Sequence, residues 1–208
     1  MFEHLSPEAL RDLASRSIHD QIRRDQERTS ELISPWLDHI WTHLFDPGLN
    51  VTQLRRVLGI RNNSEAIFFH IEIGIPPGRY IEQHRLRIAR LLLLYTRVPI
   101  TPLAPLVGYR GIASFSRAFH RLHGLRPRAY RNRHTTPVAN SASDGRGWHH
   151  SLPRLVQRLQ QLDLQTALTF GEHFEIDVAR PATELAAELE GRVREAHRVL
   201  DDIEQTRL

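Results

Sequence analysis

The chain has 208 residues, of which 40% are hydrophobic and 25% are charged, a composition typical of globular proteins with one or two domains. The absence of Cys excludes disulfides, thiolate metal sites and a cysteine nucleophile, and the absence of Lys excludes Schiff-base chemistry and a phosphate-loop lysine. The longest apolar run, around residues 91–94, is far shorter than the ~20 residues of a membrane span. No secretory leader pattern is found at the start, so we expect a cytoplasmic protein without a membrane anchor.

The net charge of +4 is distributed unevenly along the chain. Residues 50–134 hold 15 Arg and three acidic residues, a net charge of +12, whereas residues 1–49 and 135–208 each carry a net charge of −4. A basic middle between acidic flanks is typical of a module that binds a polyanion such as nucleic acid. Arginine suits that role because its planar guanidinium donates two hydrogen bonds to a phosphate or a guanine edge.

The first 50 residues predict two helices. Ser6-Pro7-Glu8 combines a capping serine, a proline at the first helical position and an acidic residue in the first turn, so a helix should run from there to about Ser30. Ser34-Pro35 is a second start, and apolar residues follow it at helical spacing. This second helix should end before Asp46-Pro47-Gly48.

Short helices separated by Gly and Pro are predicted between residues 51 and 131. Residues 135–150 are small, polar and aperiodic, which indicates a flexible linker, and residues 151–170 and 181–205 are each expected to form one further helix. The last of these carries apolar residues at alternating steps of four and three, at Leu189, Val193, Ala196, Leu200 and Ile203. Such a short heptad seam fits either packing within the chain or a homodimer through the C-terminal helix.

The basic region contains one pattern twice. The first copy consists of Gly59, Phe69, Gly74, Pro77 and Tyr80, and the second consists of Gly108, Phe115, Phe119, Gly124, Pro127 and Tyr130. The interval between the two glycines is 15 residues in the first copy and 16 in the second. Residues 80–95, between the copies, hold no stop signal and should form one continuous helix.

Each copy has the pattern of a helix-turn-helix. In the second copy, Thr101 should cap the first helix and Gly108 should permit a left-handed turn, with Leu103, Ala104 and Val107 facing the core. The helix expected at residues 112–123 should bury a stripe of Phe115, Phe119 and Leu122. A helix of this kind fits the major groove of DNA.

This arrangement resembles the signature of AraC/XylS-type transcriptional regulators, a bacterial family. The matching residues of the second copy are Ile100, Leu103, Ala104, Gly108, Tyr109, Phe115, Ser116, Arg117, Phe119, Gly124, Pro127, Tyr130 and Arg131. The first half is similar at Val51, Thr52, Leu54, Gly59, Ile60, Phe69, Gly74, Pro77, Tyr80, Ile81, Arg85, Leu86, Ala89, Leu92 and Leu93. The resemblance implies an all-α fold in which two helix-turn-helix units are joined by a long linker helix and flanked by N- and C-terminal helical segments.

The expected organisation has four segments. Residues 1–33 are an N-terminal helical segment, residues 34–134 the double helix-turn-helix domain, residues 135–150 the linker and residues 151–208 a C-terminal helical segment for dimerisation or regulation. The resemblance implies sequence-specific binding of double-stranded promoter DNA, RNA polymerase as a partner, and a place in the cytoplasm at the nucleoid. It implies no catalytic residue, metal or cofactor. The β-barrel sensor domain that the family often carries is not expected, because no long run of alternating strands is present.

The family match also predicts the residues that contact DNA: Asn62, Asn63, Ala66, Ile67, Arg110, Ile112, Ala113, Ser116, Arg117, His120 and Arg121. Asn63 can pair with adenine, whereas Ile112 and Ala113 can pack on thymine methyl groups. Glu65 stands where the family has an apolar core residue, so either this helix is rotated or Glu65 finds a partner. Four arginines of the joining helix either reach phosphates or only solvate its outer face: Arg79, Arg85, Arg87 and Arg90.

Other classes of function have weaker support. No nucleophile, zinc-protease or phosphate-loop motif is present, so catalysis is not expected. His39 and His43 are spaced as two metal ligands on one helix, but no third ligand accompanies them. One alternative is a protein-interaction module that binds another regulator through Ile67, Phe68 and Ile112. Another is a nonspecific nucleoid or RNA binder.

Overall fold

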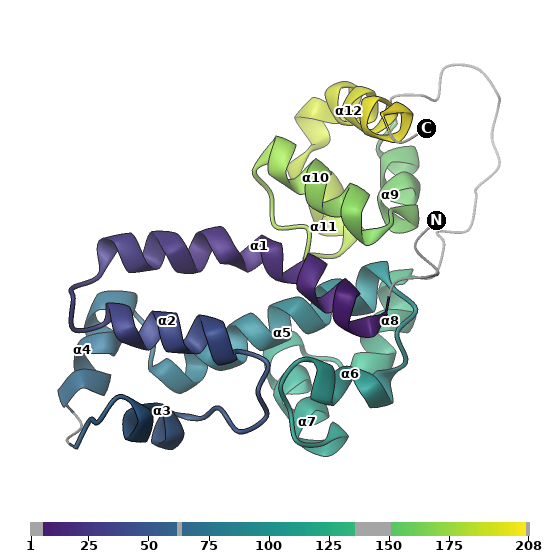
Figure 1. Cartoon of the computed structure of the whole chain (residues 1–208). Helices are drawn as coiled ribbons and strands as arrows, with labels where there is room; N and C mark the ends of the chain where they lie inside the picture. Colours follow the sequence, from purple (N-terminus) through teal and green to yellow (C-terminus); the bar gives the residue numbers. More distant parts are fainter. Residues whose placement is uncertain (1–5, 62–63, 136–150, 207–208) are drawn as a thin grey trace. The chain divides into compact units, whose positions relative to one another are not determined.

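The computed structural model describes residues 6–61, 64–135 and 151–206, and this part of the chain contains helices and no strand (Figure 1). The predicted all-α class is confirmed. The chain divides into two compact bodies. The N-terminal body comprises Leu5–Ala89 and Val98–Arg126, and the C-terminal body comprises Arg90–Arg97 and Pro127–Leu208. None of the described helices is long and apolar enough to span a membrane.

The N-terminal body contains both copies of the repeated pattern. Its helices are α1 (Pro7–Arg28), α2 (Ser34–His43), α3 (Val51–Val57), α4 (Ser64–Ile73), the first part of α5 (Pro77–Tyr95), α6 (Ile100–Leu106) and α7 (Ile112–His123). The start of α1 is as predicted, because the Ser6 hydroxyl accepts a hydrogen bond from the Ala9 amide at 3.2 Å. The continuous helix expected at residues 80–95 is α5.

The two copies form matching motifs, α3–turn–α4 and α6–turn–α7. Gly59 and Gly108 lie in the turns with φ of +70° and +84°, and Gly74 and Gly124 follow the second helices with φ of +87° and +72°. These left-handed angles favour glycine, which explains why the same residue recurs at matching places. The structure corrects one detail, because α6 begins at Ile100 and not after a Thr101 cap.

The predicted core of the second motif is largely confirmed. Leu103, Ala104 and Val107 are fully buried, and so are Phe115 and Phe119. The expectation that Leu122 is buried with them is wrong.

Leu122 is 44% exposed, whereas Ala118 is only 5% exposed and completes the buried face of α7. The buried residues Phe115, Ala118 and Phe119 span a little more than one turn of α7. The buried face therefore ends one turn before the helix does, and Leu122 lies in that last turn.

The side chain of Arg85 joins α5 to the connection between α2 and α3. Its Nε donates to the carbonyl of Leu44 and its Nη2 to the carbonyl of Asp46, both at 2.7 Å, and Nη2 also reaches the carbonyl of Leu49 at 3.4 Å. The residue is 7% exposed, and this burial lowers the pKa of Arg85. Arg85 is therefore a structural residue and does not reach a phosphate.

The turn of the second motif lies against the same guanidinium. A Cβ atom at Gly108 would be 2.7 Å from Nε of Arg85 and 3.0 Å from the carbonyl oxygen of Leu44. Glycine is thus required at this position both by its φ and by the space that Arg85 leaves.

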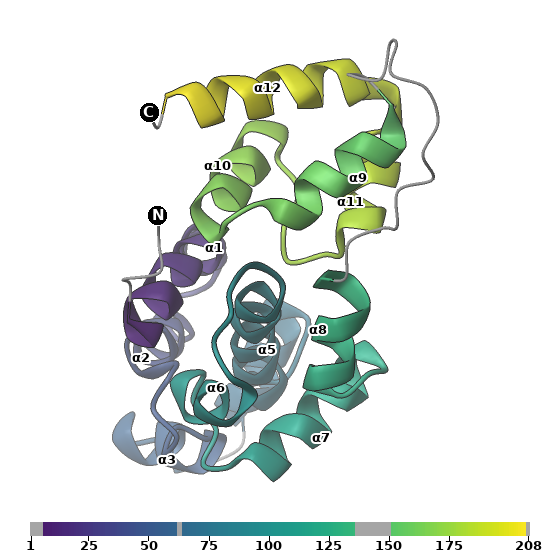
Figure 2. The ribbon, with the colours of Figure 1, turned by 90° about the vertical axis from the view of Figure 1, so that its right-hand side faces the viewer.

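Helix α1 packs into the body that holds both motifs. Ala14 and Ile18 are fully buried and Ile22 is 2% exposed, all on the face of α1 that meets α2 and α6. The Tyr80 hydroxyl of α5 donates to Oδ2 of Asp25 at 2.7 Å, and burial together with this carboxylate raises the pKa of Tyr80. Figures 1 and 2 show α1 and α3 on opposite sides of α2.

The C-terminal body includes α8 (Pro127–Thr135) and a group of further helices (Figure 2). These are α9 (Leu152–Gln161), α10 (Leu164–Phe174), α11 (Ala182–Glu188), a 3₁₀ turn (Glu190–Arg192) and α12 (Val193–Gln205). The prediction of one helix at each of residues 151–170 and 181–205 is therefore wrong, because each is broken. Asp163 starts a new helix by accepting hydrogen bonds from the Thr166 amide and hydroxyl at 2.9 and 3.0 Å. The predicted linker, from residue 136 on, lies outside the described residues.

The heptad seam at the end of the chain packs within the C-terminal body. Leu189 and Val193 are 2% and 8% exposed, and Ala196 and Leu200 are fully buried, where α12 meets α9 and α10. Arg158 of α9 tethers α12 with ion pairs to two carboxylates at 2.9 and 3.0 Å. The apolar seam is therefore buried against helices of the same chain.

We predict that Arg85→Met lowers the free energy of unfolding by about 3 kcal/mol, because two buried carbonyls lose a charged donor. Urea denaturation followed by far-ultraviolet circular dichroism measures this change. Arg16→Met, at an exposed site on α1, is the matched control and should change stability by less than about 0.5 kcal/mol. Equal denaturation midpoints for the two variants would contradict the structural role of Arg85.

Candidate nucleic-acid interface

Helix α4, the second helix of the first motif, has one buried side and one exposed side. Phe69 is fully buried and its ring lies 5.6 Å from that of Trp36. On the opposite side, Ile67 is 58% and Ile71 is 67% exposed, and Phe68 is 46% exposed on the flank. Three large apolar side chains on the surface of one short helix indicate a contact surface.

The two carboxylates of α4 are held by the segment that runs from α1 into α2. Trp36 donates its indole N–H to Oε2 of Glu65 at 3.4 Å, so Glu65 finds a partner, which is one of the two alternatives that the sequence left open. Glu72 accepts hydrogen bonds from the amide and hydroxyl of Ser30 at 2.7 and 2.8 Å. Neither carboxylate lies on the side that carries Ile67.

Helix α7, the second helix of the second motif, exposes a more polar surface. Ile112, Ala113, Arg117 and His120 are exposed, and Ser116 is half-buried. Arg117 makes no hydrogen bond or ion pair with any other residue that the structure describes. Its guanidinium is therefore available to a ligand.

Two other predicted contact residues have partners inside the N-terminal body. Arg110 donates from Nε to the carbonyl of Pro47 at 3.3 Å. Arg121 pairs with Glu82 of α5, and Glu82 also binds Arg79 at 2.9 Å. These two predicted residues thus hold the motifs in place, and DNA phosphates would have to compete with Glu82 for Arg121.

The arginines of the joining helix all have partners within the chain. Arg79 binds Glu82, Arg87 donates to a glutamine of α1 at 3.3 Å, and Arg90 donates to the carbonyl of Ala179 in the C-terminal body. Together with the buried Arg85, this favours a structural role for the whole set over phosphate contact.

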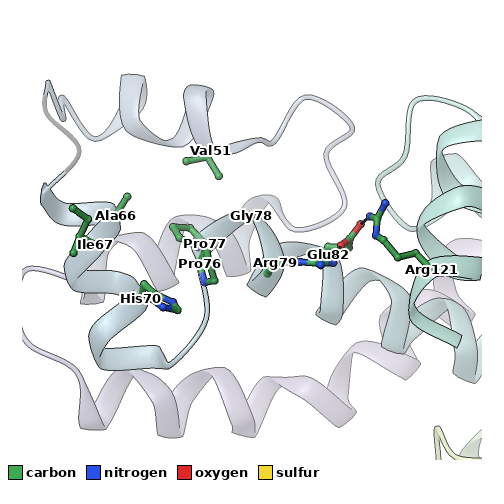
Figure 3. Close-up of a pocket in the computed structure, with 10 residues that line it drawn as sticks. All are labelled: Val51, Ala66, Ile67, His70, Pro76, Pro77, Gly78, Arg79, Glu82 and Arg121. Atoms are coloured by element: carbon green, nitrogen blue, oxygen red, sulfur yellow. Dashed lines mark hydrogen bonds and ion pairs between the residues drawn. The ribbon is translucent and has the colours of Figure 1, made fainter.

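A groove of about 800 Å³ connects the second helices of the two motifs (Figure 3). Ala66, Ile67 and His70 of α4 line one end, and Arg121 of α7 lines the other. The first turns of α5 and Val51 of α3 lie between them. Side chains of both second helices, α4 and α7, therefore face the same side of the N-terminal body.

Residues 57–133 match a family model described as a helix-turn-helix domain. The chain is 26% identical over 127 residues to the arabinose operon regulatory protein of Escherichia coli strain K12, covering 57% of this chain and 44% of that protein. The chain carries an AraC-type helix-turn-helix domain. It is also 26% identical over 133 residues to the probable transcriptional regulator LumQ of Photobacterium leiognathi, covering 62% of this chain and 54% of that protein. The chain thus spans about half the length of these two relatives.

A solved structure is also similar, the C-terminal domain of the response regulator AraT from Geobacillus stearothermophilus. It is 26% identical, has a TM-score of 0.48, and the match covers 59% of this chain and 99% of that one.

The predicted contact residues of the AraC-type domain are distributed unequally between the two motifs. Ala66 and Ile67 lie on α4, and most of the others lie on or beside α7, whereas Asn62 and Asn63 lie outside the described residues. Sequence reasoning missed Ile71, although its spacing of four from Ile67 would have placed it on the same face. It also missed Glu82, which could have been noticed as one of the three acidic residues of the basic region.

Histidine side chains offer a weaker candidate site. The rings of His39 and His43 lie 4.3 Å apart on α2, and burial and the neighbouring His43 lower the pKa of His39. Among the described residues, no group of three or more His, Asp or Glu side chains is placed to hold a metal ion.

We predict that Glu82→Gln tightens binding to DNA of any sequence about threefold, because Arg79 and Arg121 become available to phosphates. The slope of log affinity against log salt should steepen by about one. Fluorescence anisotropy with a scrambled duplex at several salt concentrations measures both quantities. Glu8→Gln makes the same charge change on α1 and is the control. Identical salt slopes for the two variants would show that Glu82 does not restrain these arginines.

Proposed function

We propose that the protein is a sequence-specific transcriptional regulator that binds double-stranded promoter DNA through both helix-turn-helix motifs. The observation that carries this proposal is the shared groove, which Ile67 of α4 and Arg121 of α7 line together. Because both second helices open to one side, a single chain can present them to successive segments of a major groove. The net charge of +12 over residues 50–134 supports the same conclusion.

The exposed residues of α7 have distinct proposed roles. Arg117 reads a guanine edge or holds a phosphate, since its guanidinium is exposed and has two parallel donors. Ile112 and Ala113 pack on thymine methyl groups, and His120 and Ser116 contact the backbone. Arg110 and Arg121 position α7 through the partners described above.

Several broader features belong to the same proposal. The protein acts by binding and not by catalysis, in the cytoplasm at the nucleoid, and RNA polymerase is its expected partner. The four-segment division remains a prediction, with residues 151–208 regulating or dimerising the domain. A homodimer through the C-terminal helix would use the exposed side of α12, because the apolar seam packs within the chain.

Selection of genomic fragments by the purified full chain tests the proposal. Anisotropy titrations of the selected fragment and of its scrambled sequence follow, at two salt concentrations. Binding at least ~10³-fold tighter to the selected fragment is the expected result. Equal and salt-sensitive binding would instead identify a nonspecific binder. Absence of binding would overturn the proposal and favour the protein-interaction alternative.

We predict that Arg117→Ala weakens binding to the selected fragment by about 1–3 kcal/mol. If Arg117 reads a base, sequence preference relaxes at one position, and if it holds a phosphate, all sequences lose affinity equally. Arg16→Ala on α1, which lies on the opposite side of α2 from α3, is the matched control and should bind as the original chain does. Unchanged binding of Arg117→Ala on several sequences would count against α7 as the reading helix.

A further inference from the structure

The exposed face of α4 is built almost entirely from apolar atoms. Ile67 and Ile71 form its centre, one helical turn apart, and are 58% and 67% exposed. Ser64 precedes them on the same face and His70 lies on its flank. The helix carries no Arg, Asn or Gln, and its carboxylates are hydrogen-bonded elsewhere, Glu65 to Trp36 of α2 and Glu72 to Ser30 between α1 and α2.

This chemistry limits what the face can recognise in DNA. The base edges in the major groove present hydrogen-bond donors and acceptors, and the one apolar group among them is the C5 methyl of thymine. An isoleucine pressed against a donor or acceptor would remove its water without replacing the hydrogen bond, which is unfavourable. The same isoleucine against a methyl group gains from the burial of both apolar surfaces.

The surroundings of α4 identify a duplex as the occupant. Residues 47–61, which include α3, contain three Arg and no acidic residue. Arg56 and Arg61 of this segment are exposed. Exposed arginines in the same motif as this apolar face fit a duplex bordered by phosphates, whereas a second copy of the same face would bring like charges together.

We propose that α4 recognises thymine methyl groups through Ile67 and Ile71. This inference rests on the proposed function and assigns the class of sequence that the first motif selects, an A·T-rich half-site. One turn of helix rises about 5.4 Å, against about 3.4 Å for a base step, so the two contacted thymines lie on the order of one to two steps apart. The second motif differs, because α7 adds the charged Arg117 to its apolar residues.

Deoxyuridine tests the assignment, because it differs from thymidine only by the missing methyl group. The selected duplex is prepared with single deoxyuridines at each thymine of both half-sites, and its affinity for the full chain is measured by anisotropy. We expect a loss of about fourfold at one or two neighbouring positions, which corresponds to one buried methyl group each. At a C·G variant of the same position, 5-methylcytosine should bind more tightly than cytosine.

Substitutions in α4 link the effect to its residues. With Ile67→Ala or Ile71→Ala, the thymidine and deoxyuridine duplexes should bind equally at the sensitive position. Val57→Ala is the matched control, since Val57 is 58% exposed on α3 and lies outside α4. This control should keep the full difference between the two duplexes.

Three results would overturn the inference. Tolerance of deoxyuridine at every position, while base-pair swaps in both half-sites weaken binding, would mean that α4 reads other groups. A footprint over a single half-site would show that α4 does not dock on DNA. Its apolar face would then be assigned to binding a partner protein. Failure of the selection itself would overturn the proposed function as well, and is distinguished because no specific duplex emerges.

Discussion

One buried arginine holds the two helix-turn-helix motifs in a single body. Arg85 extends from the joining helix α5 to the carbonyls of Leu44 and Asp46, which lead into the first motif, and it lies against Gly108 in the turn of the second. Without Arg85, the buried carbonyl of Leu44 would lose its charged donor, and without these carbonyls the buried guanidinium would be uncompensated, which is costly in both cases. The guanidinium and these carbonyls thus stabilise each other in the folded chain, and this contact fixes α5 between the motifs.

The acidic residues of the basic region have related structural tasks. Glu65 ties α4 to α2, Glu72 ties it to the segment between α1 and α2, and Glu82 joins Arg121 of α7 to α5. These are the three acidic residues among residues 50–134, and each is committed to a partner. The basic region therefore uses its few negative charges to hold helices in place, and exposed arginines such as Arg117 retain their positive charge for a ligand.

Local patterns in the sequence predicted most of the N-terminal body. Glycines at Gly59 and Gly108 marked the turns because the left-handed angle has a strong residue preference, and helical spacing marked Phe115 and Phe119 as core. Arg85 could not be assigned in this way, because its partners lie about 40 residues away and are backbone carbonyls, which have no sequence signature. Its role in the fold is a property of the tertiary structure.

The errors in the C-terminal body have a different cause. Asp163 caps α10 with the same chemistry that identified Ser6 as the cap of α1, so the break at the end of α9 had a local signal. Helical periodicity continues through that break, and this periodicity predicted one continuous helix despite the capping signal at Asp163. For the candidate interface, the positions on α7 and Ile67 on α4 followed from the sequence, whereas the extension of the apolar face of α4 to Ile71 became evident only from its exposure.

The chemical difference between α4 and α7 affects the direction in which the chain binds along DNA. Two motifs of the same fold, fixed on one side of a body, present similar shapes to DNA, and shape alone would allow the chain to bind a site in either direction. An apolar α4 and an α7 with an available guanidinium do not recognise the same bases. Where Arg117 reads a guanine edge, reversing the chain would set Arg117 against thymine methyls and Ile67 against that guanine edge, and both contacts would lose affinity. The unequal chemistry of the motifs therefore gives the bound protein a direction along the promoter, and the Arg85 contact keeps the two motifs from reorienting independently.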